Sequence, residues 1–258
     1  QGPAGASLRH LLQVPLAPYQ AEGALFAATA GRALIADEPG LGKTAQAIAT
    51  AALMRRHVGI ERVLVMCSDA SLPTWRREWL RFAGAIDAAH TRISGASRLD
   101  ATAAAALAAW QPDLVIVDEP QRLGAAWTAV TSRHSLVLCG TPHDCEPALL
   151  QSIVQYLDLP RRGSAWTWQP EERALLEAAM ASLMIQRTRE EVQAQLPEQV
   201  LSARIVPMPE AQRRAHDALA DRAGELLGRW RRSGLLPDLD QWQLDTDLHA
   251  MQALCHRD

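Results

Sequence analysis

Lysine occurs once in this 258-residue chain, at Lys43, whereas arginine occurs 25 times. Residues 37–44 read Asp-Glu-Pro-Gly-Leu-Gly-Lys-Thr. Because the chain uses arginine for ordinary surface cations, the lysine indicates a site that needs a compact ammonium on a flexible stem. In a glycine-rich loop, backbone N–H groups surround the phosphates of a nucleoside triphosphate, the lysine reaches between them and the next hydroxyl binds Mg²⁺. The residues expected to bind the nucleotide here are Pro39, Gly40, Leu41, Gly42, Lys43 and Thr44.

The segments on either side of this loop support the prediction. Residues 33–36 form a short apolar run typical of a buried parallel strand, and residues 44–54 follow a helical pattern. This order places a helix N-terminus, with its free N–H groups and positive dipole end, against the phosphates. A strict Gly-x4-Gly-Lys-Thr pattern has glycine where this chain has Asp37, but Gly40 and Gly42 still allow close approach of the backbone.

A pair of adjacent acids supplies the second half of such a site. The apolar run at residues 114–117 ends in Asp118 and Glu119. We expect Asp118 to hold Mg²⁺ together with Thr44, and Glu119 to orient the attacking water. Lys43, Asp118 and Glu119 are therefore the candidate catalytic residues. An apolar run ending in two acids is weak evidence alone, but it gains weight from its position after the phosphate loop.

Strand and helix patterns alternate through the first part of the chain. Apolar runs typical of strands lie at residues 33–36, 63–67, 114–117 and 136–139. Helical patterns lie at residues 45–57, 71–82, 98–109 and 146–157. This alternation predicts an α/β fold in three layers with a mostly parallel sheet.

The strand pattern fades beyond residue 160. Further helices are expected at 171–185, 191–196 and 209–232, with one strand candidate at 204–206. We therefore predict an ATP-binding domain at 1–160, a helical extension packed on it at 161–245, and a junction at 246–258.

Composition excludes several classes of protein. With 48% hydrophobic residues the chain can bury a real core, and its net charge of −3 confines any nucleic-acid surface to a local groove. The four cysteines include no Cys-x2-Cys pair, so neither a zinc site nor a disulfide framework is expected. No apolar stretch reaches membrane-spanning length. These features predict a cytoplasmic protein, and the abundance of alanine and arginine suggests a bacterial one. The start at Gln1 suggests a fragment or a processed chain.

Seven motifs in order give the chain a resemblance to a known family. They lie at residues 16–23, 36–48, 63–78, 118–123, 136–142, 186–197 and 251–256. Together they resemble the first half of a Swi/Snf-type motor, a superfamily-2, helicase-like ATPase that moves along double-stranded DNA. The resemblance implies that the α/β domain is the first RecA-like lobe, of the phosphate-loop class.

The resemblance also implies roles for single residues. Gln20 would read the edge of adenine, since a neutral amide can pair with both its donor and its acceptor. The residues of motifs that contact DNA are Ser68, Trp75, Arg76, Arg77 and Thr141. The residues that would couple the nucleotide site to DNA are Gln121, Gly140 and Thr141. Two alternatives stay open: Trp75 and Trp79 lie four residues apart on one helix face, which favours packing, and Thr141 could cap a helix.

Some positions depart from the family pattern. Ala17 replaces an arginine, Pro39 a methionine, Cys139 a threonine or serine, and Gln186 an arginine. The stretch at 122–135 is also shorter than the family usually has.

The function implied is ATP-dependent translocation on, or remodelling of, double-stranded DNA. The chain would bind and hydrolyse ATP with Mg²⁺ when paired with a second RecA-like lobe, which normally supplies an arginine to the γ-phosphate. The isolated chain should therefore be poorly active. Its partners would be double-stranded DNA, that second lobe and other proteins, near the nucleoid.

Two alternatives belong to other classes. One is a nucleotide-responsive module that binds DNA or protein without motor activity, which the departures at Pro39 and Gln186 favour. The other is a ring-forming phosphate-loop ATPase, which the motif at 16–23 disfavours.

Overall fold

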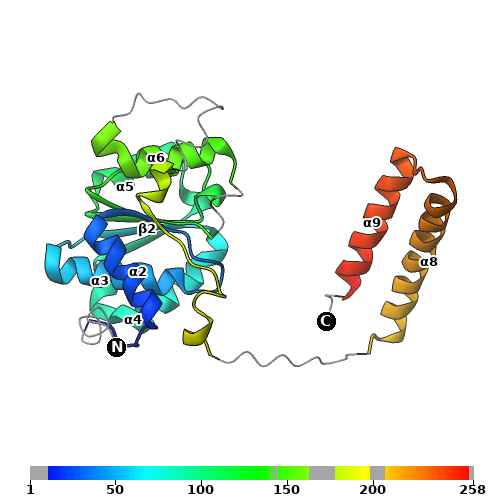
Figure 1. Ribbon diagram of the computed structural model, residues 1–258, viewed down its shortest axis with the longest axis horizontal. Coiled ribbons are helices and arrows are strands. Elements are labelled where there is room, and N and C mark those ends of the chain that lie inside the picture. The colour runs from blue at the N-terminus through cyan, green and yellow to red at the C-terminus, as the bar shows by residue number, and fades with distance from the viewer. Residues whose placement is uncertain (1–10, 141, 143–144, 163–177, 198–206, 256–258) are drawn as a thin grey trace. The chain divides into compact units, whose positions relative to one another are not determined.

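The chain forms two compact units, Gln1–Pro197 and Glu198–Asp258. The computed structural model describes residues 11–140, 142, 145–162, 178–197 and 207–255 (Figure 1).

A six-stranded parallel sheet forms the centre of the first unit. Its strand order is β3-β2-β4-β5-β1-β6. The strands are β1 (Arg32–Ile35), β2 (Val63–Cys67), β3 (Thr91–Gly95), β4 (Leu114–Asp118), β5 (His134–Leu138) and β6 (Met184–Ile185). The central strands read as continuous apolar runs because both faces of a parallel sheet are covered. The predicted α/β fold with a mostly parallel sheet is confirmed.

Helices cover the two faces of this sheet. They are α2 (Pro18–Ala30), α3 (Lys43–Val58), α4 (Leu72–Ala89), α5 (Ala101–Ala109) and α6 (Pro147–Arg162). Alternate residues of β4 point to opposite faces: Val115 and Val117 join the core with α5 and α6, whereas Leu114 and Ile116 join the core with α3 and α4. The result is three layers (Figure 1).

Strand register brings the ends of three strands to one edge. Leu138 of β5 lies opposite both Ile35 of β1 and Asp118 of β4. The segments that leave β1, β4 and β5 therefore start side by side. They are the phosphate loop, the acid pair and the loop that follows Leu138.

The structure divides the chain at a different place from the sequence pattern. Its first unit extends to Pro197 instead of ending near residue 160. The reason is β6, which pairs with β1 and so returns residues 184–185 to the sheet. At residues 191–196 the structure has only the 3-10 turn Gln193–Gln195 instead of a longer helix. The strand candidate at 204–206 lies outside the described residues.

The second unit is a helical hairpin of α8 (Glu210–Ser233) and α9 (Asp238–Cys255). α8 matches the predicted helix at 209–232. α9 begins within the predicted helical extension and continues through residue 246, at which the sequence pattern places the start of the junction. Inside the hairpin, Arg222 forms an ion pair with Asp247 at 2.6 Å. Packing of this region on the first unit stays a prediction.

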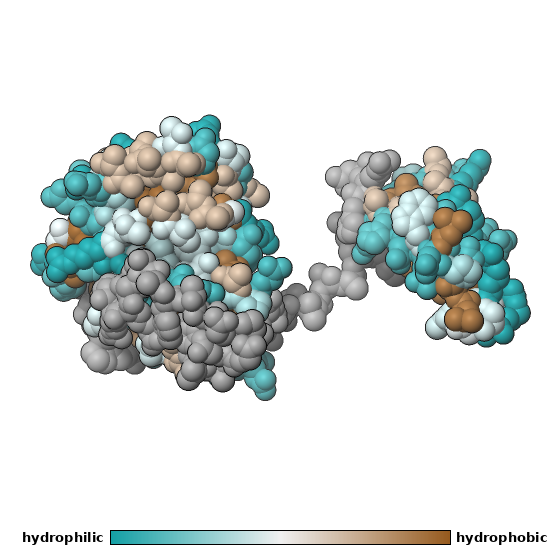
Figure 2. All heavy atoms as spheres, turned by 90° about the horizontal axis from the view of Figure 1, so that it is seen from above, coloured by the Kyte–Doolittle hydropathy of each residue, from teal (hydrophilic) through white to brown (hydrophobic). Residues whose placement is uncertain are grey.

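Large apolar side chains lie on the surface of the hairpin. Figure 2 shows brown, hydrophobic residues on this unit among hydrophilic ones, and tryptophan is almost white on the same hydropathy scale. They are Leu227, Trp230, Leu235, Leu239, Trp242 and Leu248. Across the part of the chain that the structure describes, no helix is both long and apolar enough to span a membrane.

Candidate nucleotide site

The phosphate loop depends on two glycines with positive φ. Gly40 has φ +89° and Gly42, which caps α3, has φ +78°. A Cβ added at Gly42 would lie 2.4 Å from Nε2 of Gln20, and one at Gly40 would lie 2.5 Å from a guanidinium nitrogen of Arg189. A side chain at either position would therefore be strained by the backbone angle and would displace the end of the Gln20 or Arg189 side chain. The bare backbone and the N-terminus of α3 suit a group of phosphates.

The ammonium of Lys43 lies between this loop and the acid pair. Its Nζ donates a hydrogen bond to the Asp37 carbonyl oxygen at 2.9 Å and is 4.0 Å from Oε1 of Glu119. A Cβ added at Gly140 would lie 3.1 Å from the same Nζ. The lysine is thus enclosed by the three segments that leave the sheet edge.

The two acids have different surroundings. Asp118 ends β4, and its Oδ2 accepts a hydrogen bond from the indole Nε1 of Trp75 at 2.8 Å. Burial raises the pKa of Asp118, and this is opposed by the Trp75 hydrogen bond. Glu119 has φ +50°, which is uncommon for a residue other than glycine and costs energy. Such strain is often found at functional sites.

Glu119 connects the candidate coupling residues. Its Oε2 accepts a hydrogen bond from the Gln121 amide, and its Oε1 accepts one from the Gly140 backbone N–H at 3.3 Å. Gln121 and Gly140 therefore meet at the same carboxylate. Thr141 lies outside the described residues.

Gln20 lies directly beside the phosphate loop. Its amide donates to the carbonyl oxygen of Leu41 at 3.2 Å and accepts from the backbone N–H of Ala17 at 3.1 Å. Tyr19 donates its hydroxyl to the same Leu41 carbonyl at 2.9 Å. The structure thus brings Gln20 to the loop, and recognition of adenine by Gln20 stays a prediction.

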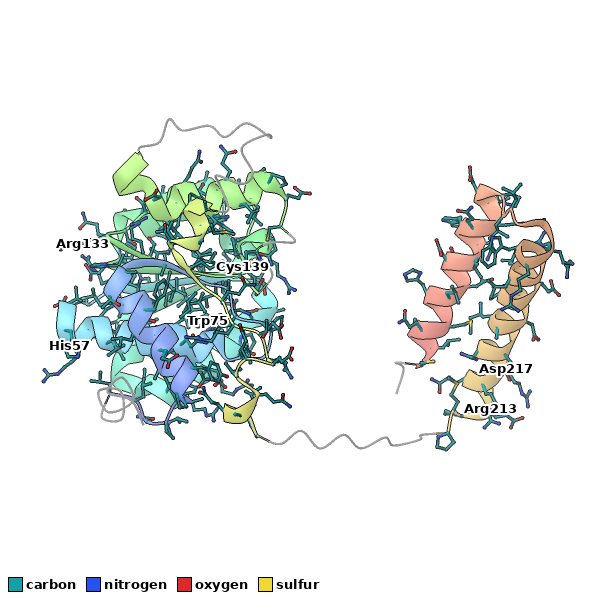
Figure 3. The ribbon with its side chains drawn as sticks, in the orientation of Figure 1. His57, Trp75, Arg133, Cys139, Arg213 and Asp217 are labelled. Carbon is teal, nitrogen blue, oxygen red and sulfur yellow. The ribbon has the colours of Figure 1, made fainter. Side chains whose placement is uncertain are left out.

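The candidate DNA-contact residues separate into two groups. Arg76 and Arg77 are exposed on α4, and Ser68 caps the short 3-10 turn Asp69–Ser71 that precedes this helix. Trp75, by contrast, is 1% exposed and lies within the body of the first unit (Figure 3). Direct contact of Trp75 with nucleic acid is therefore a wrong prediction. The amphipathic α4 turns it inward against Trp79, with 6.3 Å between the ring centroids.

A buried ion pair beneath the loop was missed by sequence reasoning. The Asp37 side chain is fully buried, and its Oδ2 accepts from Arg187 at 3.1 Å and from Gln46 at 2.8 Å. The Arg187 guanidinium also lies 5.8 Å from the centroid of the Tyr19 ring. Asp37 in place of glycine was the available signal, but no local pattern pairs residues that are 150 positions apart.

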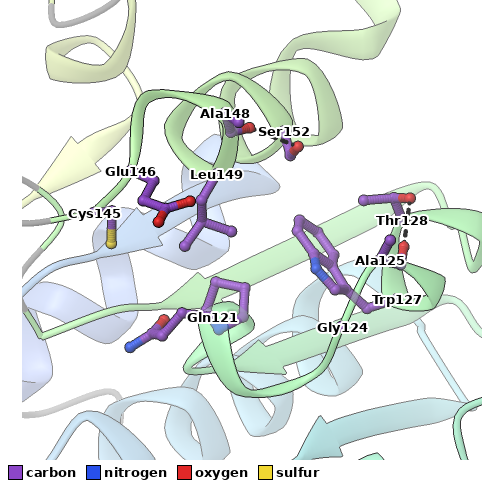
Figure 4. A pocket seen from close by; sticks show the side chains of 11 residues that line it. Gln121, Gly124, Ala125, Trp127, Thr128, Cys145, Glu146, Ala148, Leu149 and Ser152 are labelled. Carbon is purple, nitrogen blue, oxygen red and sulfur yellow. Dashed lines mark hydrogen bonds between the residues drawn. The ribbon is translucent and has the colours of Figure 1, made fainter.

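A separate open pocket of about 620 Å³ is lined in part by Pro120 and Gln121, which follow the acid pair in the sequence (Figure 4). Its lining includes Gln121, Trp127, Cys145, Glu146 and Leu149. Gln121 therefore belongs both to this pocket and to the hydrogen-bonded group around Glu119.

The residues present fit a nucleotide with Mg²⁺ better than a metal centre built by the protein alone. Among the described residues, no three His, Cys, Asp or Glu side chains gather into a metal site. Mg²⁺ bound with phosphates commonly takes only one or two protein ligands beside water and phosphate oxygens. Thr44 and Asp118 could supply these. The glycine loop, the helix N-terminus and Lys43 suit the phosphates.

Comparisons with known proteins agree with this geometry. Residues 19–117 match the SNF2-related domain. The chain is 27% identical over 227 residues to the Xenopus tropicalis SWI/SNF-related matrix-associated actin-dependent regulator of chromatin subfamily A-like protein 1. That match covers 70% of this chain but only 23% of the relative's length.

Two solved structures of the Sulfolobus solfataricus SWI2/SNF2 ATPase core share the fold. One is in complex with double-stranded DNA and has a TM-score of 0.62, and the other, of the core domain, has a TM-score of 0.61. Both are 18% identical in sequence to this chain, and each match covers 95% of this chain. The same matches cover only 59% and 57% of the lengths of the two solved chains. Residues 19–117 are thus similar to an SNF2-related domain, and the chain shares the fold of the SWI2/SNF2 ATPase core, in agreement with the Swi/Snf-type, helicase-like first lobe that the seven motifs predict.

Proposed function

We propose that this chain is the first lobe of an ATP-dependent motor that moves along or remodels double-stranded DNA. The observation that carries the proposal is the convergence of Lys43, Glu119 and Gly140. Lys43 Nζ is 4.0 Å from the Glu119 carboxylate, which also accepts the Gly140 N–H at 3.3 Å. A cation and an acid thus meet beside a phosphate loop, which is the arrangement that phosphoryl transfer to water requires.

Each residue has a role that its position supports. Backbone N–H groups of the loop and the Lys43 ammonium bind the phosphates. Thr44 and Asp118 hold Mg²⁺, which neutralises phosphate charge when it is bound. Glu119 orients water for in-line attack and accepts its proton, while Gln121 and Gly140 fix the Glu119 carboxylate.

Arg76 and Arg77 would provide contacts with DNA. Exposed arginines on one helix bind backbone phosphates, so they add affinity and salt dependence without sequence preference. One of the similar solved structures is a complex with double-stranded DNA, which supports this choice of partner. On composition alone, we place the protein in a bacterial cytoplasm.

A second lobe would complete the active site. It would supply an arginine to the γ-phosphate, an interaction worth roughly 10³–10⁵ in rate. We therefore expect the 258-residue chain to bind Mg²⁺ and nucleotide yet hydrolyse ATP slowly. Rapid DNA-stimulated turnover by this chain alone would contradict that expectation.

The proposal is tested by measuring ATP hydrolysis by the full-length protein with three competing activators. Double-stranded DNA should stimulate more than single-stranded DNA or RNA. Stimulation by RNA alone would refute the choice of substrate. Nucleotide and DNA binding without stimulated hydrolysis would instead favour a binding module without motor activity.

Substitution of Lys43 tests the assignment of the site. Lys43→Ala should abolish ATP turnover by the full-length protein. The unfolding transition should be retained, because the side chain acts on phosphate rather than in the core. Lys43→Arg keeps the charge but replaces the compact ammonium with a planar fork, so it should also fail. Near-normal turnover in Lys43→Ala would refute the assignment.

A further inference from the structure

Two tryptophans on α4 have nearly the same environment but differ in one contact. Trp75 and Trp79 are 1% and 2% exposed and pack against each other. The indole N–H of Trp75 donates to Oδ2 of Asp118 at 2.8 Å. The indole N–H of Trp79 is buried and has no hydrogen-bond partner within the described residues. Packing alone explains Trp79, whereas Trp75 also contacts a candidate metal ligand.

The contact restricts the orientation of the Asp118 carboxylate. An indole N–H is only a donor, so it occupies one carboxylate oxygen and leaves the other for a different partner. The Trp75 ring cannot easily move, because it lies in the core between α4 and the sheet with Val65, Ile116 and Trp79. A rigid donor therefore holds Oδ2 and leaves Oδ1 for the nucleotide site.

The same helix presents cations to solvent. Arg76 and Arg77 follow Trp75 directly and are exposed, so one turn of α4 carries both an outward basic face and the inward indole. A helical turn moves as a unit because its backbone is hydrogen-bonded. A displacement of this turn by a partner bound to Arg76 or Arg77 would therefore alter the hydrogen bond between the Trp75 indole and Asp118.

We propose that Trp75 is a positioning residue that orients Asp118 toward Mg²⁺ and connects the DNA-facing side of α4 to the metal site. The proposal rests on the roles proposed above for Asp118, Arg76 and Arg77. It explains why a residue in a DNA-contact motif is buried.

The chain supplies its own control for testing this inference. Trp75→Phe and Trp79→Phe each remove the same atoms from the same buried layer, but only Trp75→Phe removes a hydrogen bond to Asp118. Affinity for a non-hydrolysable ATP analogue is measured by calorimetry on the full-length protein, with Mg²⁺ and with EDTA. Residues that orient metal ligands typically contribute about 10–100-fold in metal affinity. In Trp75→Phe, the gain in affinity from Mg²⁺ should fall about tenfold, with little change in EDTA.

The outcomes separate this inference from the proposed function. Equal Mg²⁺ dependence in Trp75→Phe and Trp79→Phe would overturn the inference and leave the nucleotide site intact. A wild-type protein that gains no affinity from Mg²⁺ would instead overturn the role of Asp118 itself. In an Asp118→Asn background, Trp75→Phe should have no further effect on the Mg²⁺ dependence, and a further loss would count against the inference.

If Trp75→Phe does not fold, the inference can still be tested by NMR on the unsubstituted protein. The indole N–H resonances of the chain are followed by NMR as Mg²⁺ and the analogue are added, and then as a DNA duplex is added. The Trp75 resonance should shift at both steps and by more than that of Trp79. If the Trp75 resonance stays in place while nucleotide binds, Trp75 does not position the metal site.

Discussion

Gly42 and Gly124 both have a backbone angle that is strained for other residues, but only Gly42 also has a close neighbouring side chain. Both have positive φ, +78° and +66°, where a side chain costs roughly 1–2 kcal/mol. A Cβ at Gly42 would lie 2.4 Å from the Gln20 amide, whereas nothing lies within 4 Å of a Cβ at Gly124. A side chain would therefore strain the backbone equally at both positions, but only at Gly42 would it also crowd a residue of the candidate site.

Alanine substitutions at these two glycines should accordingly differ in function but not in backbone strain. Gly42→Ala and Gly124→Ala should each lower the free energy of unfolding by about 1–2 kcal/mol in urea titrations. Only Gly42→Ala displaces Gln20, so only this variant should lose preference for ATP over GTP in competition binding. An unchanged preference in Gly42→Ala would argue against recognition of adenine by Gln20.

At the scale of elements, β6 brings Arg187 to the phosphate loop. The chain continues alongside the loop after β6, since the Glu38 N–H donates to the Arg187 carbonyl oxygen at 3.0 Å. This path lets the Arg187 side chain, 11% exposed, pair with the buried Asp37 carboxylate at 3.1 Å. The last strand of the sheet thereby fixes the start of the loop.

Removing one partner of this pair should be costly. Arg187→Met leaves the Asp37 carboxylate buried without its cation, which should cost about 3–5 kcal/mol of stability. Adding Asp37→Asn should recover part of this loss, because the uncompensated charge is then gone. Urea unfolding of the two single variants and the double variant gives the coupling. If the double variant is no more stable than Arg187→Met, the ion pair does not explain the burial of Asp37.

His134, at the start of β5, gives the first unit a pH dependence. Burial and the neighbouring Arg133 lower the pKa of His134 below its usual value, against weaker opposing contributions from the Gly31 backbone and Asp113. The unfolded chain therefore binds the proton more readily than the folded one. This contribution to stability is present above the unfolded pKa of about 6.5 and is lost as pH falls through the lower folded pKa.

The melting temperature should therefore fall from pH 7 toward pH 5, and His134→Gln should reduce this fall. Differential scanning calorimetry of both proteins over this range measures the difference. Identical pH profiles would show that His134 does not contribute.

The sequence predicted elements with strong local patterns and missed those without them. The apolar run that forms β2 (Val63–Cys67) is readable because a covered parallel strand is apolar throughout. β3 reads Thr-Arg-Ile-Ser-Gly and lies at the edge of the sheet, so only Ile93 signals burial. β6 has two residues, which is too short to show a period. These strands exist because neighbouring strands pair with them.

The same distinction applies to the candidate site. Lys43 and Asp118 could be found because phosphate loops and acid pairs are local patterns. The Trp75–Asp118 hydrogen bond joins residues 43 positions apart, and it depends on the side of α4 that packs on the sheet. Such contacts follow only from the assembled fold.

At the scale of the whole molecule, the described residues of the candidate nucleotide site belong to the first unit, Gln1–Pro197. A chain ending at Pro197 should therefore bind Mg²⁺ and the ATP analogue within about twofold of the 258-residue chain, as expected for independent parts. Calorimetry on both proteins makes the comparison. A loss of about tenfold, or 1.4 kcal/mol, would show that the helical hairpin contributes to nucleotide binding.

The central claim is that Lys43, Asp118 and Glu119 act on one triphosphate. The most direct test is a crystal structure of the chain with Mg²⁺ and a non-hydrolysable ATP analogue. We predict that the Lys43 ammonium lies within about 3.2 Å of a β- or γ-phosphate oxygen. Asp118 and Thr44 should face the Mg²⁺, and Glu119 should face a water in line with the γ-phosphate. A nucleotide bound elsewhere, or these side chains turned away from its phosphates, would contradict the claim.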